Sequence, residues 1–139
     1  MENINVIDLF CGAGGLSQGF KQAGYKVLMG VDFDDAALKT YAHNLKDSIA
    51  LKADLFDEEA SIKQIEKLLK GNTVDVVIAG PPCQGFSLTG SRDINDSRNK
   101  LYVAVVDTVK HFQPKAFLIE NVPGMATLYK GKVKEQIIN

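Results

Sequence analysis

A cysteine directly behind two prolines is the most reactive feature of this sequence. Cys83 follows Pro81 and Pro82, just after the apolar run VDVVIA (74–79). The prolines supply no backbone N–H and fix φ, so the chain cannot continue here as a regular helix or strand. A free thiol is only a few per cent thiolate at pH 7, yet it remains a far better nucleophile than a hydroxyl. The alternative is a small buried apolar side chain, but the rigid prefix favours a nucleophile.

A carboxyl group ends a second apolar run. Glu120 follows the four apolar residues AFLI and precedes Asn121. A carboxyl group that emerges from an apolar core can have a raised pKa, which suits it to hold or share a proton. We therefore expect Cys83 and Glu120 to face a common cavity.

Two other chemistries of cysteine have little support. His43 and His111 fall within expected helices and are distant from Cys83 in the sequence, which argues against a Cys–His hydrolase. No Cys-x-x-Cys pair or Cys/His cluster has the spacing of metal ligands, so no metal site is predicted. Cys11 and Cys83 are too few for a disulfide scaffold, which favours a reduced, cytoplasmic setting.

A glycine-rich turn marks a second candidate site. Gly12, Gly14 and Gly15 lie between an expected strand and an expected helix. Such glycines permit positive φ and close approach of a ligand, and the helix start supplies free N–H groups for an anion. The spacing matches neither the dinucleotide pattern G-x-G-x-x-G nor a phosphate loop. The alternative is a turn that serves only helix–strand packing.

Carboxylates and aromatic residues follow the next two strands. Asp32 comes about 20 residues after the glycines, where a carboxylate can accept both hydroxyls of a ribose. Asp54 can accept a hydrogen bond from an exocyclic amine. Helix capping is the alternative for either, although the aspartates at 34–35 are also placed to cap. Phe10 and Phe33 are expected either in the core or on the faces of a flat ligand.

Strands and helices must alternate to position these residues. Strands are expected at 4–10, 26–32, 48–54, 74–80 and 115–121, and helices at 15–24, 36–45, 58–71 and 100–112. This alternation, with nearly continuous Val/Ile/Leu strands, predicts an α/β fold: a doubly wound, mostly parallel, Rossmann-like sheet with helices on both faces. Ligands of such sheets bind outside the carboxyl ends of the strands, where all the candidate residues fall.

Composition limits the class of protein. The chain has 139 residues, of which 45% are hydrophobic and 24% charged, as is typical of one soluble globular domain (1–139). A net charge of −1 predicts no bulk attraction to nucleic acid, so a polyanion would be held by a local patch or by parts outside this chain. No apolar run approaches the roughly 18 residues of a membrane span, and no signal peptide is recognisable.

The motifs, taken in order, resemble those of the DNA (cytosine-5)-methyltransferases of bacterial restriction–modification systems. DLFCGAGGLSQGF looks like the first motif of that family, VDFD the second, AD (53–54) the third, GPPCQGFS the fourth, DSRNKLY (96–102) the start of the fifth, and ENV the sixth. The matches are collinear from residue 4 to about 124. Adenine and N4-cytosine methyltransferases carry an aromatic residue where this chain has Cys83.

This resemblance implies transfer of a methyl group from S-adenosylmethionine to C5 of cytosine in DNA. Cys83 would add to C6, and Glu120 would engage N3 and the exocyclic amine. Loss of the C5 proton would later expel the thiolate. The implied cofactor-binding residues are Phe10, Gly12, Gly14, Gly15, Leu16, Asp32, Phe33, Asp54, Leu55, Gly80, Pro82 and Leu101.

The segment 86–99 is unusually long for a strand–helix connection. The resemblance implies a loop that closes over a cytosine flipped out of duplex DNA, since a stacked base cannot present C5 and C6 to a thiol. Ser87, Arg92 and Arg98 are the expected substrate and DNA contacts. A solvated surface loop is the alternative.

The family continues beyond ENVPGM with a target-recognition region and a motif that completes the cofactor pocket. We therefore expect a fragment, a split-enzyme half or part of a larger protein, acting with the missing C-terminal half or a second chain. Two alternative functions stay open: a tRNA cytosine-C5 methyltransferase, and a non-catalytic cofactor-binding or regulatory module that depends on a partner chain.

Overall fold

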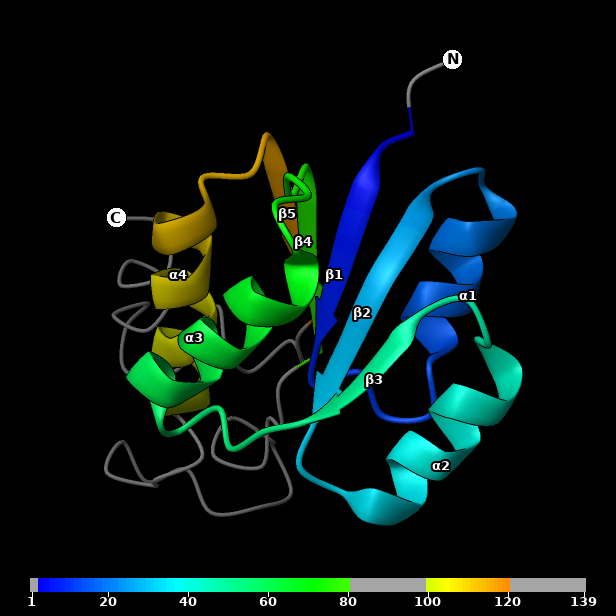
Figure 1. Cartoon of the computed structure of the whole chain (residues 1–139), viewed down its shortest axis with the longest axis horizontal. Helices are drawn as coiled ribbons and strands as arrows, with labels where there is room; N and C mark the ends of the chain where they lie inside the picture. The colour runs from blue at the N-terminus through cyan, green and yellow to red at the C-terminus, as the bar shows by residue number, and fades with distance from the viewer. Residues whose placement is uncertain (1–2, 81–99, 121–139) are drawn as a thin grey trace, which may run out of the picture.

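Strands and helices alternate along the chain as the sequence predicts. The computed structural model describes residues 3–80 and 100–120. Its elements, in order, are β1 (Asn5–Leu9), α1 (Gly15–Gln22), β2 (Lys26–Asp32), α2 (Asp35–Asn44), β3 (Ile49–Lys52), α3 (Glu58–Leu69), β4 (Val76–Ala79), α4 (Lys100–Phe112) and β5 (Ala116–Ile119) (Figure 1). The expected strand 26–32 and helix 100–112 coincide with β2 and α4. The other elements begin or end within two residues of the expected limits.

The strands form one parallel sheet in the order β3-β2-β1-β4-β5. The chain starts at the centre with β1, moves outward to β3, and then returns to β4 on the other side of β1. Helices α1 and α2 cover one face of the sheet, and α3 and α4 lie together on the other (Figure 1). This arrangement confirms the doubly wound α/β fold and places its switch point between β1 and β4.

The core has a larger part on the α3/α4 face. Because successive side chains of a strand point to opposite faces, each central strand contributes to both layers. The buried residues of the larger cluster include Ile7, Leu9, Met29, Val31, Ile65, Val77 and Val105. Smaller clusters join Val6, Val27 and Ile78 to α1, and Tyr41 to Leu38, Leu45 and Cys11 near α2.

Local residues end and begin the helices as expected. Gly24, with φ 97°, follows the last turn of α1 and adopts the left-handed backbone that favours glycine. Asp34 caps α2, since its Oδ1 accepts a hydrogen bond from the N–H of Ala36 at 3.0 Å. The cap of α2 is therefore Asp34 and not Asp32, which leaves the Asp32 carboxylate for other contacts.

The run AFLI differs from the expectation of a core strand. Phe117 is 48% exposed and its neighbour Leu118 is 47% exposed, so β5 shows apolar side chains on both faces. The physical reason is position: β5 pairs with β4 on one side and is the outermost strand of the described sheet.

Among the helices at 15–69 and 100–112, none is both long and apolar enough to cross a membrane.

Candidate functional site

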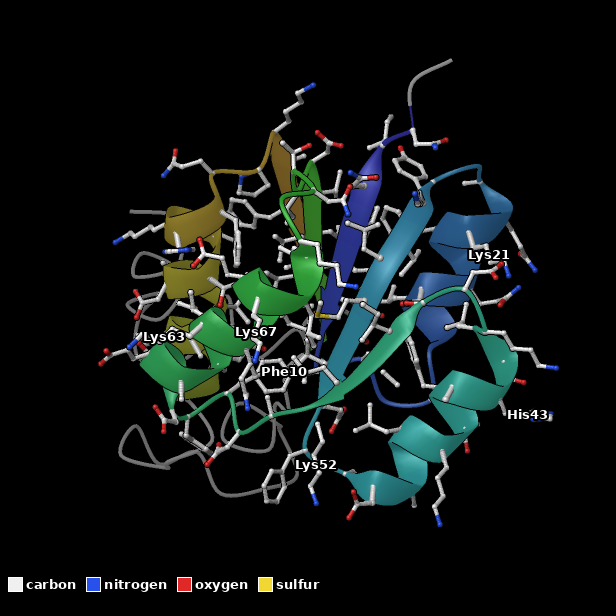
Figure 2. The ribbon with its side chains drawn as sticks, viewed as in Figure 1. Phe10, Lys21, His43, Lys52, Lys63 and Lys67 are labelled. Carbon is white, nitrogen blue, oxygen red and sulfur yellow. The ribbon has the colours of Figure 1, made fainter. Side chains whose placement is uncertain are left out.

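The carboxyl ends of β1, β2 and β3 surround a pocket of about 310 Å³. Figure 2 shows Phe10 and Lys52 at this end of the sheet. The lining residues are Phe10, Asp32, Phe33, Ala53, Asp54, Leu55 and Phe56. Five of them were predicted as cofactor-binding residues from the sequence, and three strand ends bring them together. Ala53 and Phe56 are additions that sequence reasoning missed.

Asp32 is fixed by three backbone N–H groups. Its Oδ1 accepts from Phe33 at 2.7 Å and from Asp34 at 3.0 Å. Its Oδ2 accepts from Gly12 at 2.8 Å, which ties the glycine turn to the end of β2. A carboxylate has roughly four acceptor positions. Three are occupied, so the geometry leaves space for about one further donor where the sequence suggested two.

Asp54 has one oxygen engaged and one available. Its Oδ1 accepts from the N–H of Phe56 at 2.9 Å, in a turn that an aspartate side chain often forms with the backbone two residues on. Its Oδ2 makes no hydrogen bond within 3–80 or 100–120. The same turn brings Phe56 to the pocket, where its side chain stays 45% exposed. A large aromatic residue two positions after Asp54 was the signal in the sequence.

Phe33 lies on the pocket wall and not in the core. Its side chain is 67% exposed, which excludes the core alternative. The Nζ of Lys52 lies 5.6 Å from the centre of the ring, and Nζ is also 2.9 Å from Asp35 Oδ2. A cation at this distance is attracted by the ring face. Lys52 and Asp35 thus support Phe33 from the side of β3 and α2.

Phe10 combines both roles that the sequence left open. It packs partly buried against the larger core cluster and also lines the pocket. Its φ of 54° is rare for a bulky residue and costs energy unless the surroundings hold it. Strained backbone of this kind often marks a ligand site.

The glycine turn has the positive φ values that were expected. Gly12 has φ 56° and Gly14 has φ 99°. A Cβ on Gly14 would lie 2.6 Å from Leu45 Cδ1, whereas one on Gly12 or Gly15 would meet nothing within 4 Å. Gly14 therefore needs both its conformation and its lack of a side chain, so packing is part of its role. Leu16, in α1, is partly buried against the cluster of Val6, Val27 and Ile78. None of the residues Gly12, Gly14, Gly15 and Leu16 lines the pocket. Gly12 is linked to it only by the hydrogen bond that its N–H donates to Asp32.

Glu120 directly follows β5 and lies beside the carboxyl end of β4. Its N–H donates to Ala79 O at 2.8 Å, and a Cβ on Gly80 would stand 3.0 Å from Glu120 Oε2. The carboxyl group is therefore next to the last residue before Pro81. Several predicted positions lie outside the described residues: Pro82, Cys83, Ser87, Arg92, Arg98 and the side chain of Leu101. Their roles, and a common cavity for Cys83 and Glu120, stay predictions.

Cys11 is an unreactive thiol. It is buried and free, and its Sγ contacts Gly12 O at 3.5 Å. Burial, with smaller contributions from Asp8 and Asp32, raises the pKa of Cys11 well above its usual value. A thiol that keeps its proton is a poor nucleophile, so Cys11 is not a candidate nucleophile.

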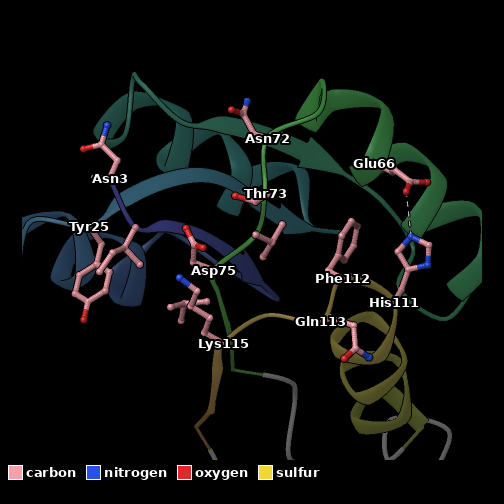
Figure 3. Close-up of a pocket in the computed structure, with 13 residues that line it drawn as sticks. Asn3, Tyr25, Glu66, Asn72, Thr73, Asp75, His111, Phe112, Gln113 and Lys115 are labelled. Carbon is pink, nitrogen blue, oxygen red and sulfur yellow. Dashed lines mark hydrogen bonds and ion pairs between the residues drawn. The ribbon is translucent and has the colours of Figure 1, made fainter. Parts of the chain in front are cut away.

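A second pocket, of about 810 Å³, lies at the opposite, amino ends of the strands (Figure 3). Its wall includes the pair His111 and Glu66, whose Nε2 and Oε1 are 3.2 Å apart. Asp75 is occupied by the backbone N–H of Asn5 at 2.8 Å. The lining contains none of the predicted site residues. The candidate chemistry is therefore at the carboxyl ends of the strands.

Comparisons with known proteins show the family of this chain. The family model of C-5 cytosine-specific DNA methylases matches residues 4–139. Type II methyltransferase M.AgeI from Thalassovita gelatinovora is 44% identical over 137 residues, which are 97% of this chain and 32% of that protein. Type II methyltransferase M.DdeI from Desulfomicrobium norvegicum is 42% identical over 125 residues, 90% of this chain and 29% of that protein.

Structural comparison gives the same result. A putative DNA modification methyltransferase encoded within a prophage (E. coli) superposes with a TM-score of 0.82 and 38% sequence identity, covering 99% of this chain and 37% of that one. The chain thus spans about a third of the length of these relatives. The family model extends over nearly every residue and confirms the resemblance seen in the motifs. The chain belongs to the C-5 cytosine-specific DNA methylase family.

Proposed function

We propose that this chain forms the cofactor-binding and catalytic part of a restriction–modification enzyme that methylates C5 of cytosine in DNA, with S-adenosylmethionine as methyl donor. One observation carries the proposal. The pocket at the ends of β1, β2 and β3 has aromatic walls and two carboxylates, and the Glu120 carboxyl group lies beside Gly80, directly before Pro-Pro-Cys.

The pocket suits the adenosyl part of this donor. Phe10, Phe33 and Phe56 offer ring faces to a flat base. The available Oδ2 of Asp54 can accept from an exocyclic amine, and the remaining acceptor position of Asp32 can take one ribose hydroxyl. When bound, S-adenosylmethionine supplies an electrophilic methyl group.

Cys83 and Glu120 act on the cytosine. The Cys83 thiolate forms a bond to C6, and the electron pair of the C5–C6 double bond makes C5 nucleophilic. Glu120 holds a proton at N3 and so limits the negative charge that the attack creates. After C5 is methylated, a base takes the C5 proton, the electron pair of the C5–H bond restores the C5–C6 double bond, and the bond between Cys83 and C6 breaks. The complete cycle therefore begins and ends with a Cys83 thiolate.

The substrate side of the proposal extends beyond the described residues. Duplex DNA must present a flipped cytosine, because stacking hides C5 and C6. Ser87, Arg92 and Arg98 are the proposed contacts to substrate and phosphates, and base recognition is assigned to a C-terminal half or a second chain. The family model is that of C-5 cytosine-specific DNA methylases, and the similar E. coli structure is a putative DNA modification methyltransferase, which favours DNA over tRNA.

Covalent trapping tests the nucleophile. With S-adenosylmethionine and the C-terminal half supplied, we expect a stable adduct with duplex DNA that carries 5-fluorocytosine, since fluorine at C5 prevents the final elimination. Cys83→Ser should form none, and Cys11→Ser is the matched thiol control. An adduct that persists in Cys83→Ser refutes the nucleophile. If wild-type protein binds S-adenosylhomocysteine but forms no adduct, the non-catalytic module is the better account.

A further inference from the structure

A chain of buried hydrogen bonds runs behind the glycine turn. Asp8 in β1 is only 1% exposed, and Ser17 in α1 and Tyr41 in α2 are fully buried. Ser17 Oγ lies 2.6 Å from Asp8 Oδ2 and 3.1 Å from the Tyr41 hydroxyl, which in turn lies 2.8 Å from Ser48 Oγ before β3. These four side chains, here called the hydroxyl chain, join β1, α1, α2 and the start of β3.

When Asp8 is ionised, the protons of the hydroxyl chain have one direction. Ser17 has a single hydroxyl proton and donates it to Asp8. Its oxygen must then accept from Tyr41, whose own oxygen accepts from Ser48. Burial raises the pKa of Tyr41, so its hydroxyl keeps the proton that it donates. Each hydroxyl therefore depends on the next, and removing the Tyr41 hydroxyl would leave Ser17 without a donor.

Two glycines make space for Tyr41. The register of β1 and β2 pairs Asp8 with Gly30, and a Cβ on Gly30 would overlap the Tyr41 ring at Cζ. A Cβ on Gly14 would stand 2.9 Å from Tyr41 Cδ2. The Tyr41 ring thus lies against both the glycine turn and β2, and its hydroxyl reaches the hydroxyl chain between them.

The glycine turn is the part of the cofactor site that these contacts hold. Its Cys11 N–H donates to Val31 O at 3.0 Å, and its Gly12 N–H donates to Asp32 Oδ2. We propose that the hydroxyl chain is a positioning device for the cofactor pocket, in which Tyr41 and Ser17 fix the glycine turn so that Gly12 orients the Asp32 carboxylate. This inference rests on the proposed function for the identity of the ligand.

Asp8 makes the device sensitive to pH. Its Oδ1 is buried and has no hydrogen-bond partner in the described residues, so ionisation would leave a charged oxygen without a donor. Burial raises the pKa of Asp8 to about 7, against the opposing effect of Ser17. The titratable groups that face it are Cys11, Asp32 and Tyr41. Above pH 7 the ionised carboxylate must attract water, which loosens the contact between β1 and α1.

Tyr41→Phe tests the inference because it keeps the ring and removes the hydroxyl. We expect the dissociation constant for S-adenosylhomocysteine, measured by calorimetry, to rise about five- to tenfold, as for loss of a buried hydrogen bond. The Gly12 amide should exchange with solvent faster in the ligand-free protein. Tyr25→Phe is the matched control, since Tyr25 lies at the amino ends of the strands. Unchanged affinity and unchanged Gly12 exchange in Tyr41→Phe would overturn the inference.

The pH profile separates positioning from a merely structural role. Wild-type affinity for S-adenosylhomocysteine should fall as the pH rises from 6 to 8.5, and Asp8→Asn, which stays neutral, should remove that dependence. A profile that is equally steep in Asp8→Asn contradicts the role of Asp8. If wild-type protein, with the C-terminal half supplied, does not bind S-adenosylhomocysteine at all, the proposed cofactor fails, while Gly12 exchange in Tyr41→Phe still decides on the positioning device.

Discussion

Replacing Gly14 with alanine should destabilise the fold for two separable reasons. The first is backbone strain, since φ at Gly14 is 99° and a left-handed conformation costs a residue with a Cβ about 1–2 kcal/mol. The second is overlap, because the new Cβ would lie 2.6 Å from Leu45 Cδ1 and 2.9 Å from Tyr41 Cδ2. Overpacking of a filled core costs about 1–3 kcal/mol, so the total is about 2–5 kcal/mol.

Two neighbouring glycines isolate these contributions. Gly12 has φ 56° but open space where a Cβ would go, so Gly12→Ala carries strain alone. Gly30 is not among the glycines with positive φ, yet its Cβ would overlap the Tyr41 ring, so Gly30→Ala carries overlap alone. We expect the loss in Gly14→Ala to approximate the sum of the losses in the other two variants.

Urea unfolding provides the measurement. With a slope of about 2 kcal/mol per molar urea for a chain of this size, a loss of about 3 kcal/mol lowers the midpoint by about 1.5 M. The slope itself should not change, since the variants alter the native state locally. If Gly12→Ala and Gly14→Ala lose equal stability, the contact of Gly14 with Tyr41 and Leu45 contributes nothing, and the account of the turn is wrong.

Three further predictions concern charge and aromatic contacts. Folding raises the pKa of Asp8 from 3.8 to about 7, so the native state binds a proton that the unfolded state has lost. The free energy of unfolding should therefore fall by up to about 4 kcal/mol as the pH rises from about 4 to 7. Thermal unfolding of Asp8→Asn should lack this fall, and an identical fall in the variant would refute the prediction. Phe56→Ala should raise the dissociation constant for S-adenosylhomocysteine about tenfold, because stacking area is lost. Phe117→Ala, with a similarly exposed side chain on β5, is the control, and equal effects of the two would argue against a wall at Phe56. Lys52→Met should weaken the same binding about twofold at low salt and less at high salt, since exposed cation–ring contacts are weak; an effect that ignores salt would contradict an electrostatic role.

Local patterns made most of the fold predictable. The strand 26–32 is a continuous apolar run that ends at Asp32, and Asp34 has the residue type and position of a helix cap, so both follow from neighbours in the sequence. The convergence of Asp32 and Asp54 follows from a general rule of parallel sheets and needed no knowledge of strand order.

Contacts between distant elements were not predictable in this way. Tyr41 looks like an ordinary core residue of α2 until the register of β1 and β2 places Gly30 beneath its ring. The run AFLI was expected in the core, but strand order places it at an edge, and sequence alone does not give that order. Cys83 lies outside the described residues, so the nucleophile stays a prediction.

The left-handed backbone at Phe10 limits which substitutions can raise the thermal stability of this protein without weakening ligand binding. Glycine or asparagine at position 10 would relax the main chain, and screening for heat resistance alone would favour such replacements. Either would remove an aromatic wall from the pocket. Thermostabilised variants of this family that keep full donor affinity should therefore retain the aromatic ring here and gain their stability elsewhere.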